Sequence, residues 1–119
     1  MKASAMKQCV NGCFAAFLCV AAAPAAAQQS ARLELGEKVF NASCKACHDT
    51  GLPQNDAPQL SEQTEWKDRY GKGRADLYKN AIDGFSAYYA MPPRGGNAAL
   101  SDDEVKAAVD YLLQRARVR

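Results

Sequence analysis

The sequence predicts an all-α fold of about four helices. Apolar residues recur at helical spacing in four stretches, and no stretch alternates between apolar and polar residues as a half-buried strand would. The loops at 49–61 and 85–100 are long and rich in turn-forming residues. Loops of this length in a small domain usually carry function. We therefore expect a helical scaffold whose long loops form the functional site.

The chain begins with a segment unlike the rest. A basic start is followed by an uncharged apolar run over residues 13–23, and residues 24–27 (Pro-Ala-Ala-Ala) end in small side chains. This order is typical of a secretory signal peptide, and the run is shorter than the roughly 20 residues that span a membrane. We expect residues 1–27 to be removed and residues 28–119 to form one mature domain; an uncleaved N-terminal anchor is the alternative.

Cleavage there leaves few residues that carry chemistry. Cys44 and Cys47 are the only cysteines of the mature part, Met91 is its only methionine, and His48 is the only histidine of the chain. Loss of the leader lysines takes the net charge from +2 to near neutral. A near-neutral domain argues against nucleic acid as a partner and against membrane binding after cleavage.

The four helices are expected in this order. The first covers residues 31–42, with Ser30 as its cap, and the second covers residues 62–70. The third covers residues 74–83, and a glycine after it suits a left-handed helix end. The fourth follows Ser101, which opens a Ser-Asp-Asp-Glu capping box ahead of an apolar stripe.

The segment Cys44-Lys45-Ala46-Cys47-His48 has several chemical interpretations. A redox dithiol normally starts a helix in a βαβ unit, which this sequence lacks. A zinc site needs three or four ligands, and only Asp49 is near enough in sequence to join Cys44, Cys47 and His48. A disulfide between the two cysteines would close too small a loop to add much stability.

The remaining interpretation uses every residue of the segment. C-x-x-C-H is the attachment pattern of c-type haem, in which each thiol forms a thioether with one vinyl group. The imidazole of His48 then becomes the first axial ligand of the iron. Export agrees with this interpretation, because such attachment takes place outside the bacterial cytoplasm. We expect one haem c, bound covalently through Cys44 and Cys47.

The second axial ligand has few candidates. Met91 is the only thioether of the mature part, and Pro92-Pro93 and Gly95-Gly96 follow it. A residue before proline favours extended geometry, and two prolines stiffen the loop that presents the side chain. Met91 is therefore predicted as the second ligand of the iron; an ordinary buried methionine is the alternative.

These motifs together resemble the class I bacterial cytochromes c, and most closely the cytochrome c5 type. The resemblance rests on residues 44–48, on "MPPRGG" at 91–96 and on "LSDDEV" at 100–105, and it spans about residues 35–113. It implies the small cytochrome c fold, with helices and long loops wrapped around one haem. The c5 type often has an additional cysteine pair near the methionine loop, where this chain has residues 97–99 (Asn-Ala-Ala).

The resemblance also implies roles for further residues. The first helix should cross the last where a glycine and an aromatic residue face another aromatic residue, namely Gly36, Phe40 and Tyr111. The carbonyl of Pro58 should accept a hydrogen bond from the ligand histidine, which fixes the imidazole tautomer. Trp66 and Arg69 should lie near the haem propionates. Generic helix packing, and a core tryptophan beside a solvated arginine, are the alternatives.

Two side-chain ligands leave no position at the iron for a substrate. We therefore expect an electron carrier and not an enzyme, with a reduction potential raised by the methionine. We expect a soluble, periplasmic, monomeric monohaem cytochrome that transfers single electrons between periplasmic or membrane-bound redox proteins. Such partners dock transiently over small interfaces.

Two other functions remain open from the sequence. The first is a dedicated electron-transfer subunit of a periplasmic dehydrogenase or oxidase, for which Tyr88 and Tyr89 would form an apolar contact patch. The second is a haem sensor in which the Met91 bond is labile. Four basic residues are either solvated or steer acidic partners: Lys38, Lys45, Lys72 and Arg94.

Overall fold

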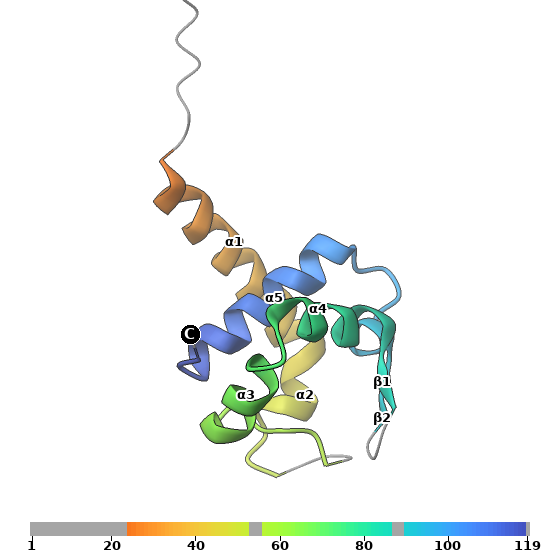
Figure 1. Ribbon diagram of the computed structural model, residues 1–119. Helices are drawn as coiled ribbons and strands as arrows, with labels where there is room; N and C mark the ends of the chain where they lie inside the picture. Colours follow the sequence, from red (N-terminus) through yellow and green to blue (C-terminus); the bar gives the residue numbers. More distant parts are fainter. Residues whose placement is uncertain (1–23, 53–55, 87–89, 119) are drawn as a thin grey trace, which may run out of the picture.

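A computed structural model of the chain describes residues 24–52, 56–86 and 90–118. The expected signal peptide lies outside these residues except for its last four, and Tyr88 and Tyr89 also lie outside them. The described elements, shown in Figure 1, are α1 (Ala25–Val39), η1 (a π-helix, Phe40–Cys44), α2 (Lys45–His48), α3 (Gln63–Tyr70), α4 (Arg74–Asp83), β1 (Phe85–Ser86), β2 (Ala90–Met91), η2 (a 3-10 helix, Pro93–Gly96) and α5 (Asp102–Arg115).

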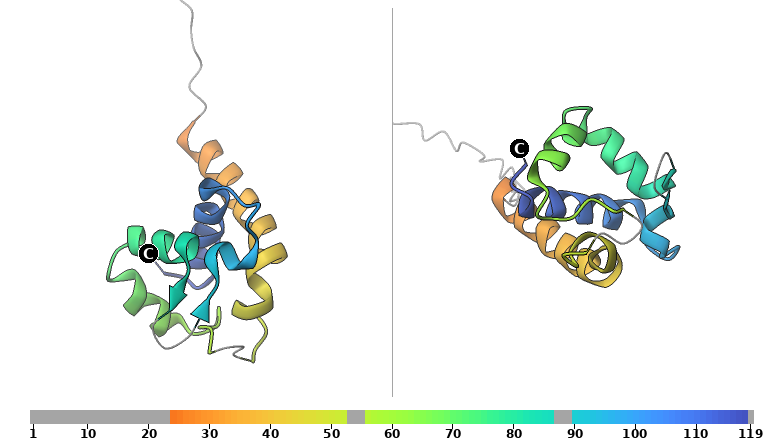
Figure 2. Two further views of the ribbon diagram at one scale, coloured as in Figure 1. Left: turned by 90° about the vertical axis from the view of Figure 1, so that its right-hand side faces the viewer. Right: turned by 90° about the horizontal axis from the view of Figure 1, so that it is seen from below.

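The last helix is the centre of the fold. In both views of Figure 2, α5 runs between α1 and α2 on one side and α3 and α4 on the other. It begins at the capping box that the sequence predicts: the Glu104 backbone N–H donates to Ser101 Oγ, and the Ser101 N–H donates to Glu104 Oε2 at 2.8 Å. Its apolar stripe is buried, with Leu113 only 1% exposed. The predicted all-α architecture is confirmed.

Helices α1 and α5 cross at Gly36, where the absence of a side chain lets the two backbones approach closely. A Cβ atom on Gly36 would lie 2.1 Å from the carbonyl oxygen of Ala107, so no other residue permits this approach. Beside the crossing, the ring centroids of Phe40 and Tyr111 are 5.5 Å apart, and Phe40 is 2% exposed. The structure thus contains the contact that the resemblance implies.

The first helix differs from the prediction at both ends. It begins at Ala25, and Ser30 lies inside it and is not its cap; the Ser30 hydroxyl donates to the Ala26 carbonyl oxygen at 3.0 Å. Alanine has the highest helix propensity, so the alanine-rich start extends the helix. After Val39 the chain continues through η1 into α2, which places the C-x-x-C-H segment on continuous helical backbone.

The segment after α4 holds short strands that the sequence analysis did not predict. Gly84 follows α4 with φ +86° and ψ 163°, so its φ is positive, but it does not adopt the left-handed helical conformation that the sequence predicts. The chain then forms a two-stranded antiparallel ladder in which Phe85 pairs with Met91. Strands of two residues are too short to show alternation, so periodicity could not reveal them.

The buried carboxylate of Asp110 joins α5 to α1 and α4. Asp110 is 8% exposed and accepts hydrogen bonds from Arg32 of α1 at 2.6 Å and from the Tyr78 hydroxyl of α4. Arg74 lies 3.4 Å from the same carboxylate. A buried charge is tolerated when it is paired and hydrogen-bonded.

None of the helices within the described ranges has the length and apolar character that crossing a membrane requires.

Candidate cofactor site

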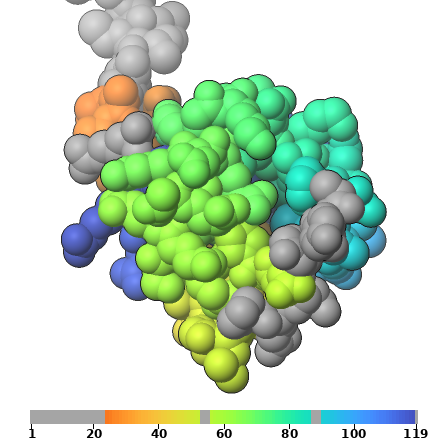
Figure 3. All heavy atoms as spheres, turned by 60° about the horizontal axis from the view of Figure 1, so that its bottom comes forward, coloured from red at the N-terminus to blue at the C-terminus, as the bar shows by residue number. Residues whose placement is uncertain are grey.

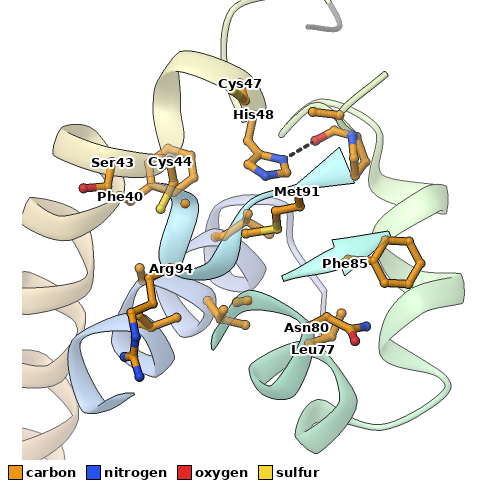
Figure 4. Close-up of a pocket in the computed structure, with 18 of the residues that line it drawn as sticks. Phe40, Ser43, Cys44, Cys47, His48, Leu77, Asn80, Phe85, Met91 and Arg94 are labelled. Atoms are coloured by element: carbon orange, nitrogen blue, oxygen red, sulfur yellow. Dashed lines mark hydrogen bonds between the residues drawn. The ribbon is translucent and has the colours of Figure 1, made fainter. Parts of the chain in front are cut away.

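A large apolar cavity opens between η1, α2, α4, the short hairpin and α5. The space between its walls, with the open mouth included, is about 1260 Å³. Aliphatic and aromatic side chains form most of the wall, among them Val39, Leu77, Phe85, Val105, Val109 and Leu112. All seven predicted site residues line it. Figure 4 labels four of them, namely Cys44, Cys47, His48 and Met91.

His48 ends α2 and is 8% exposed. Its Nδ1 lies 2.9 Å from the carbonyl oxygen of Pro58 and donates a hydrogen bond to it, drawn as the dashed line in Figure 4. This bond leaves Nε2 as the nitrogen with a free lone pair. Burial lowers the pKa of His48, the Pro58 bond opposes that effect, and the charge of Arg69 adds to it. The imidazole is therefore held neutral, the form that binds metal ions.

A glutamine that the sequence analysis missed supports the histidine. Gln59 is 5% exposed; its Nε2 donates to the carbonyl oxygens of Cys47 at 2.8 Å and Ala57 at 2.9 Å. Its Oε1 accepts the Thr50 N–H at 3.1 Å. These bonds connect the 49–61 loop to the backbone of the C-x-x-C-H segment. A polar residue in a loop is typical of solvated surface, so the sequence contains no signal for this role.

Trp66 and Arg69 of α3 both line the cavity. Trp66 is 6% exposed, its ring centroid lies 5.8 Å from that of His48, and its Nε1–H donates to the Gln59 carbonyl oxygen at 2.8 Å. The Arg69 guanidinium donates to Glu65 within its own helix at 2.6 Å. In Figure 3, α3 and the segment leading to it (yellow-green to green) form most of the visible surface. Contact of Trp66 and Arg69 with haem propionates stays a prediction.

Cys44 and Cys47 are free, half-buried thiols on the wall of the cavity. Burial raises the pKa of Cys44 to about 11, and the neighbouring Cys47 adds to this. A redox dithiol needs a stabilised thiolate, so the environment of Cys44 argues against that interpretation. Two thiols beside a neutral imidazole, in a cavity with a thioether, fit the donor set that a covalent haem requires.

Met91 lies in a paired strand directly before two prolines, which together restrict its backbone. Its strand β2 pairs with β1, and Pro92 and Pro93 follow directly. Figure 4 shows its side chain directed into the cavity that also receives His48. A helical scaffold with C-x-x-C-H on one wall of an apolar cavity and a methionine loop on another defines the c-type cytochrome class.

Comparison with known proteins agrees with this class. The family described as "Cytochrome C oxidase, cbb3-type, subunit III" matches residues 31–112. Cytochrome c-555 of Chlorobaculum tepidum is 34% identical over 83 residues, which are 69% of this chain and 75% of that protein. Cytochrome c5 of Azotobacter vinelandii is 42% identical over 79 residues, which are 65% of this chain and 89% of that protein.

A solved structure is also similar. It is described as "Crystal structure of electron transfer complex of nitrite reductase with cytochrome c", with a TM-score of 0.60 and 34% identity over 70% of this chain and 95% of that one. The chain therefore belongs to the cytochrome c family that the matching model describes, and it is a class I monohaem c-type cytochrome. Membership of this family implies a covalently bound haem c.

Proposed function

We propose that the protein is a soluble, periplasmic monohaem cytochrome that carries single electrons between redox proteins. The observation that carries the proposal is the convergence of His48 and Met91 on one apolar cavity whose wall also holds both cysteines. With two side-chain ligands, the iron offers no position to a substrate, which supports a carrier and not an enzyme. The haem, when bound, supplies an Fe(III)/Fe(II) couple.

Each protein residue then has a defined task. Cys44 and Cys47 would hold the haem as thioethers, and Nε2 of His48 and the sulfur of Met91 would bind its iron. Pro58 keeps the proton on Nδ1 of the imidazole and so fixes the ligand tautomer. The apolar wall excludes water, which disfavours the more highly charged ferric state and, together with the thioether, raises the reduction potential.

The partners are proposed to be redox proteins that dock transiently. The complex of the similar cytochrome c with nitrite reductase supports a redox enzyme as one kind of partner. Weak complexes of this kind use small interfaces and dissociate quickly. The basic start, short apolar run and small-residue end of residues 1–27 support export to the periplasm.

The description of the matching family favours one second candidate. A match to subunit III of a cbb3-type oxidase supports an electron-transfer subunit that stays bound to an oxidase. Cell fractionation separates the two functions. A free carrier is released with the periplasmic contents by osmotic shock, whereas an oxidase subunit stays with the membranes and co-purifies with oxidase activity.

A visible spectrum of the holoprotein tests the proposed ligands. The reduced protein should give a sharp low-spin spectrum that carbon monoxide leaves unchanged. Met91→Ala should retain the haem but bind carbon monoxide, because one axial position becomes open. Replacing Cys44 and Cys47 together should abolish haem that survives denaturation. A low-spin reduced spectrum in Met91→Ala, insensitive to the gas, would exclude Met91 as the ligand.

A further inference from the structure

Arg94, three residues after Met91, is engaged in internal bonds. The sequence analysis treats it as a solvated or partner-steering charge, but the structure turns its side chain back onto the start of α5. Nη1 donates to the carbonyl oxygen of Leu100 at 2.8 Å, and Nη2 donates to Asp102 Oδ1 at 2.6 Å. The side chain is 26% exposed, and the residue also lines the cavity.

Apart from Arg94, one exposed side-chain hydrogen bond joins the methionine loop to the helices: Asn97 Nδ2 donates to Ser43 Oγ of η1 at 3.3 Å. The other bonds of the loop form local turns. The Gly95 N–H donates to the Pro92 carbonyl oxygen at 3.1 Å, and the Asn97 N–H donates to the Arg94 carbonyl oxygen at 3.2 Å. The Leu100 N–H donates to the Asn97 carbonyl oxygen at 3.2 Å. Such bonds shape the loop but do not fix it to the helices. The Arg94 side chain connects the loop to α5 and so fixes the position of the local turns relative to this helix.

The two acceptors of Arg94 are rigidly placed. Asp102 is the first residue of α5, and Leu100 directly precedes the Ser101 capping box. The planar guanidinium donates in a fixed fork, so two acceptors on one helix end define both its position and its orientation. Arg94 itself adopts φ +55°, an uncommon value for a residue with a side chain, and is held there by these bonds.

We propose that Arg94 is a positioning residue that holds Met91 at the iron by tethering the methionine loop to the N-terminus of α5. The proposal rests on the proposed function, in which Met91 is the second axial ligand. An exposed ion pair adds little to global stability, so the tether acts on local opening of the loop. Loss of the tether raises the population of the open loop, and an external ligand then binds with higher apparent affinity in proportion.

Imidazole titration of the ferric holoprotein, followed by visible spectroscopy, measures that population. Arg94→Gln should bind imidazole about tenfold more tightly than wild type, and Asp102→Asn should bind it several-fold more tightly. The double variant should resemble Arg94→Gln, because both changes break one tether. Arg94→Lys should restore part of the effect, since an ammonium reaches one acceptor but lacks the fork. The midpoint of thermal unfolding should change little.

Matched controls separate the tether from simple loss of charge. Asp103→Asn removes a carboxylate that is 84% exposed in the same turn of α5, and Lys106→Gln removes a cation from the same helix. Both should bind imidazole within twofold of wild type. An affinity change in these controls equal to that of Asp102→Asn would overturn the proposal in favour of a general charge effect.

The reference variant Met91→Ala distinguishes failure of the two proposals. If Met91→Ala does not increase imidazole affinity, Met91 is not the ligand and the proposed function fails. If Met91→Ala opens the site but Arg94→Gln behaves as wild type, only the positioning role is overturned. Fully additive effects of Arg94→Gln and Asp102→Asn would also overturn it, because a single tether can be broken only once.

Discussion

The two sides of the cofactor cavity are built differently. On the histidine side, His48, Gln59 and Trp66 are each less than 9% exposed and joined to the backbone by hydrogen bonds. On the methionine side, Met91 is only half-buried, and the described residues of η2 after it include none that is buried. One proposed ligand is therefore held by the folded core and the other by a loop at its edge.

The difference indicates where the site can change. Opening the histidine side would break the buried hydrogen bond of Trp66 and expose its ring, which costs more free energy than opening exposed turns. Opening the methionine side breaks exposed turns, the Arg94 tether and the exposed hydrogen bond from Asn97 to Ser43. Elements with few buried contacts open at the lowest free energy. We expect ligand exchange at the Met91 side and a permanent bond at His48.

The largest expected effect on the methionine side comes from Gly84→Ala. At Gly84, φ is +86°, and a Cβ atom would lie 2.9 Å from the Met91 carbonyl oxygen and 3.0 Å from Pro93 Cδ. The strain costs about 1–3 kcal/mol, and relief requires the loop to move. Carbon monoxide should therefore bind the reduced variant while helical circular dichroism is retained. Gly73→Ala, with φ +117° and nothing within 4 Å, is the control for strain alone. Equal behaviour of the two variants would contradict the prediction.

Gln59→Leu tests the histidine side. The change leaves the partly buried carbonyl oxygens of Cys47 and Ala57 without this donor. An unpaired polar group costs up to about 1–3 kcal/mol when it is fully buried. Urea unfolding should show lower stability, while the reduced spectrum stays insensitive to carbon monoxide. Gln114→Leu, on the exposed surface of α5, should leave stability nearly unchanged. If Gln59→Leu instead admits carbon monoxide at wild-type stability, the two sides are not supported differently.

A smaller loss is expected for Trp66→Phe. The aromatic packing against His48 is largely kept, but the hydrogen bond from Nε1 to the Gln59 carbonyl oxygen is lost. The free energy of unfolding should fall by about 0.5–1.5 kcal/mol, as measured in urea, with no change in haem ligation. Unchanged stability would mean that this bond does not contribute to the histidine side.

The smallest effect concerns the helix end to which the methionine loop is tethered. Hydrogen bonds from the Ser101 N–H and then from its hydroxyl lower the pKa of Glu104 from the ordinary 4.5. A group with a lowered pKa stabilises the fold above its unfolded pKa and loses that contribution as pH falls through the folded value. The melting temperature should therefore fall less steeply below pH 4.5 in Glu104→Gln than in wild type. Parallel pH profiles would show that the capping box does not contribute.

Site residues that belong to a sequence motif, or that are the only residue of their type, could be predicted from the sequence. Cys44, Cys47 and His48 lie within one five-residue motif, and Met91 is the only methionine after residue 27, so both walls of the proposed site could be predicted from the sequence. The Pro58 contact required knowledge of a family, because nothing in a single chain shows which carbonyl faces an imidazole ten residues away. Gln59 and Arg94 were missed, since each looks like a solvated side chain until its buried or distant acceptors are known.

The sequence alone determined the helices and the capping box and predicted the proposed haem-binding residues, because periodicity, caps and motif spacing are properties of neighbouring residues. The tertiary structure decided that α1 and α5 meet at Gly36, that Gln59 is buried, and that Arg94 reaches Asp102 instead of solvent. These outcomes depend on which distant segments lie side by side, and burial sets the energetic importance of a polar group only after the chain has folded.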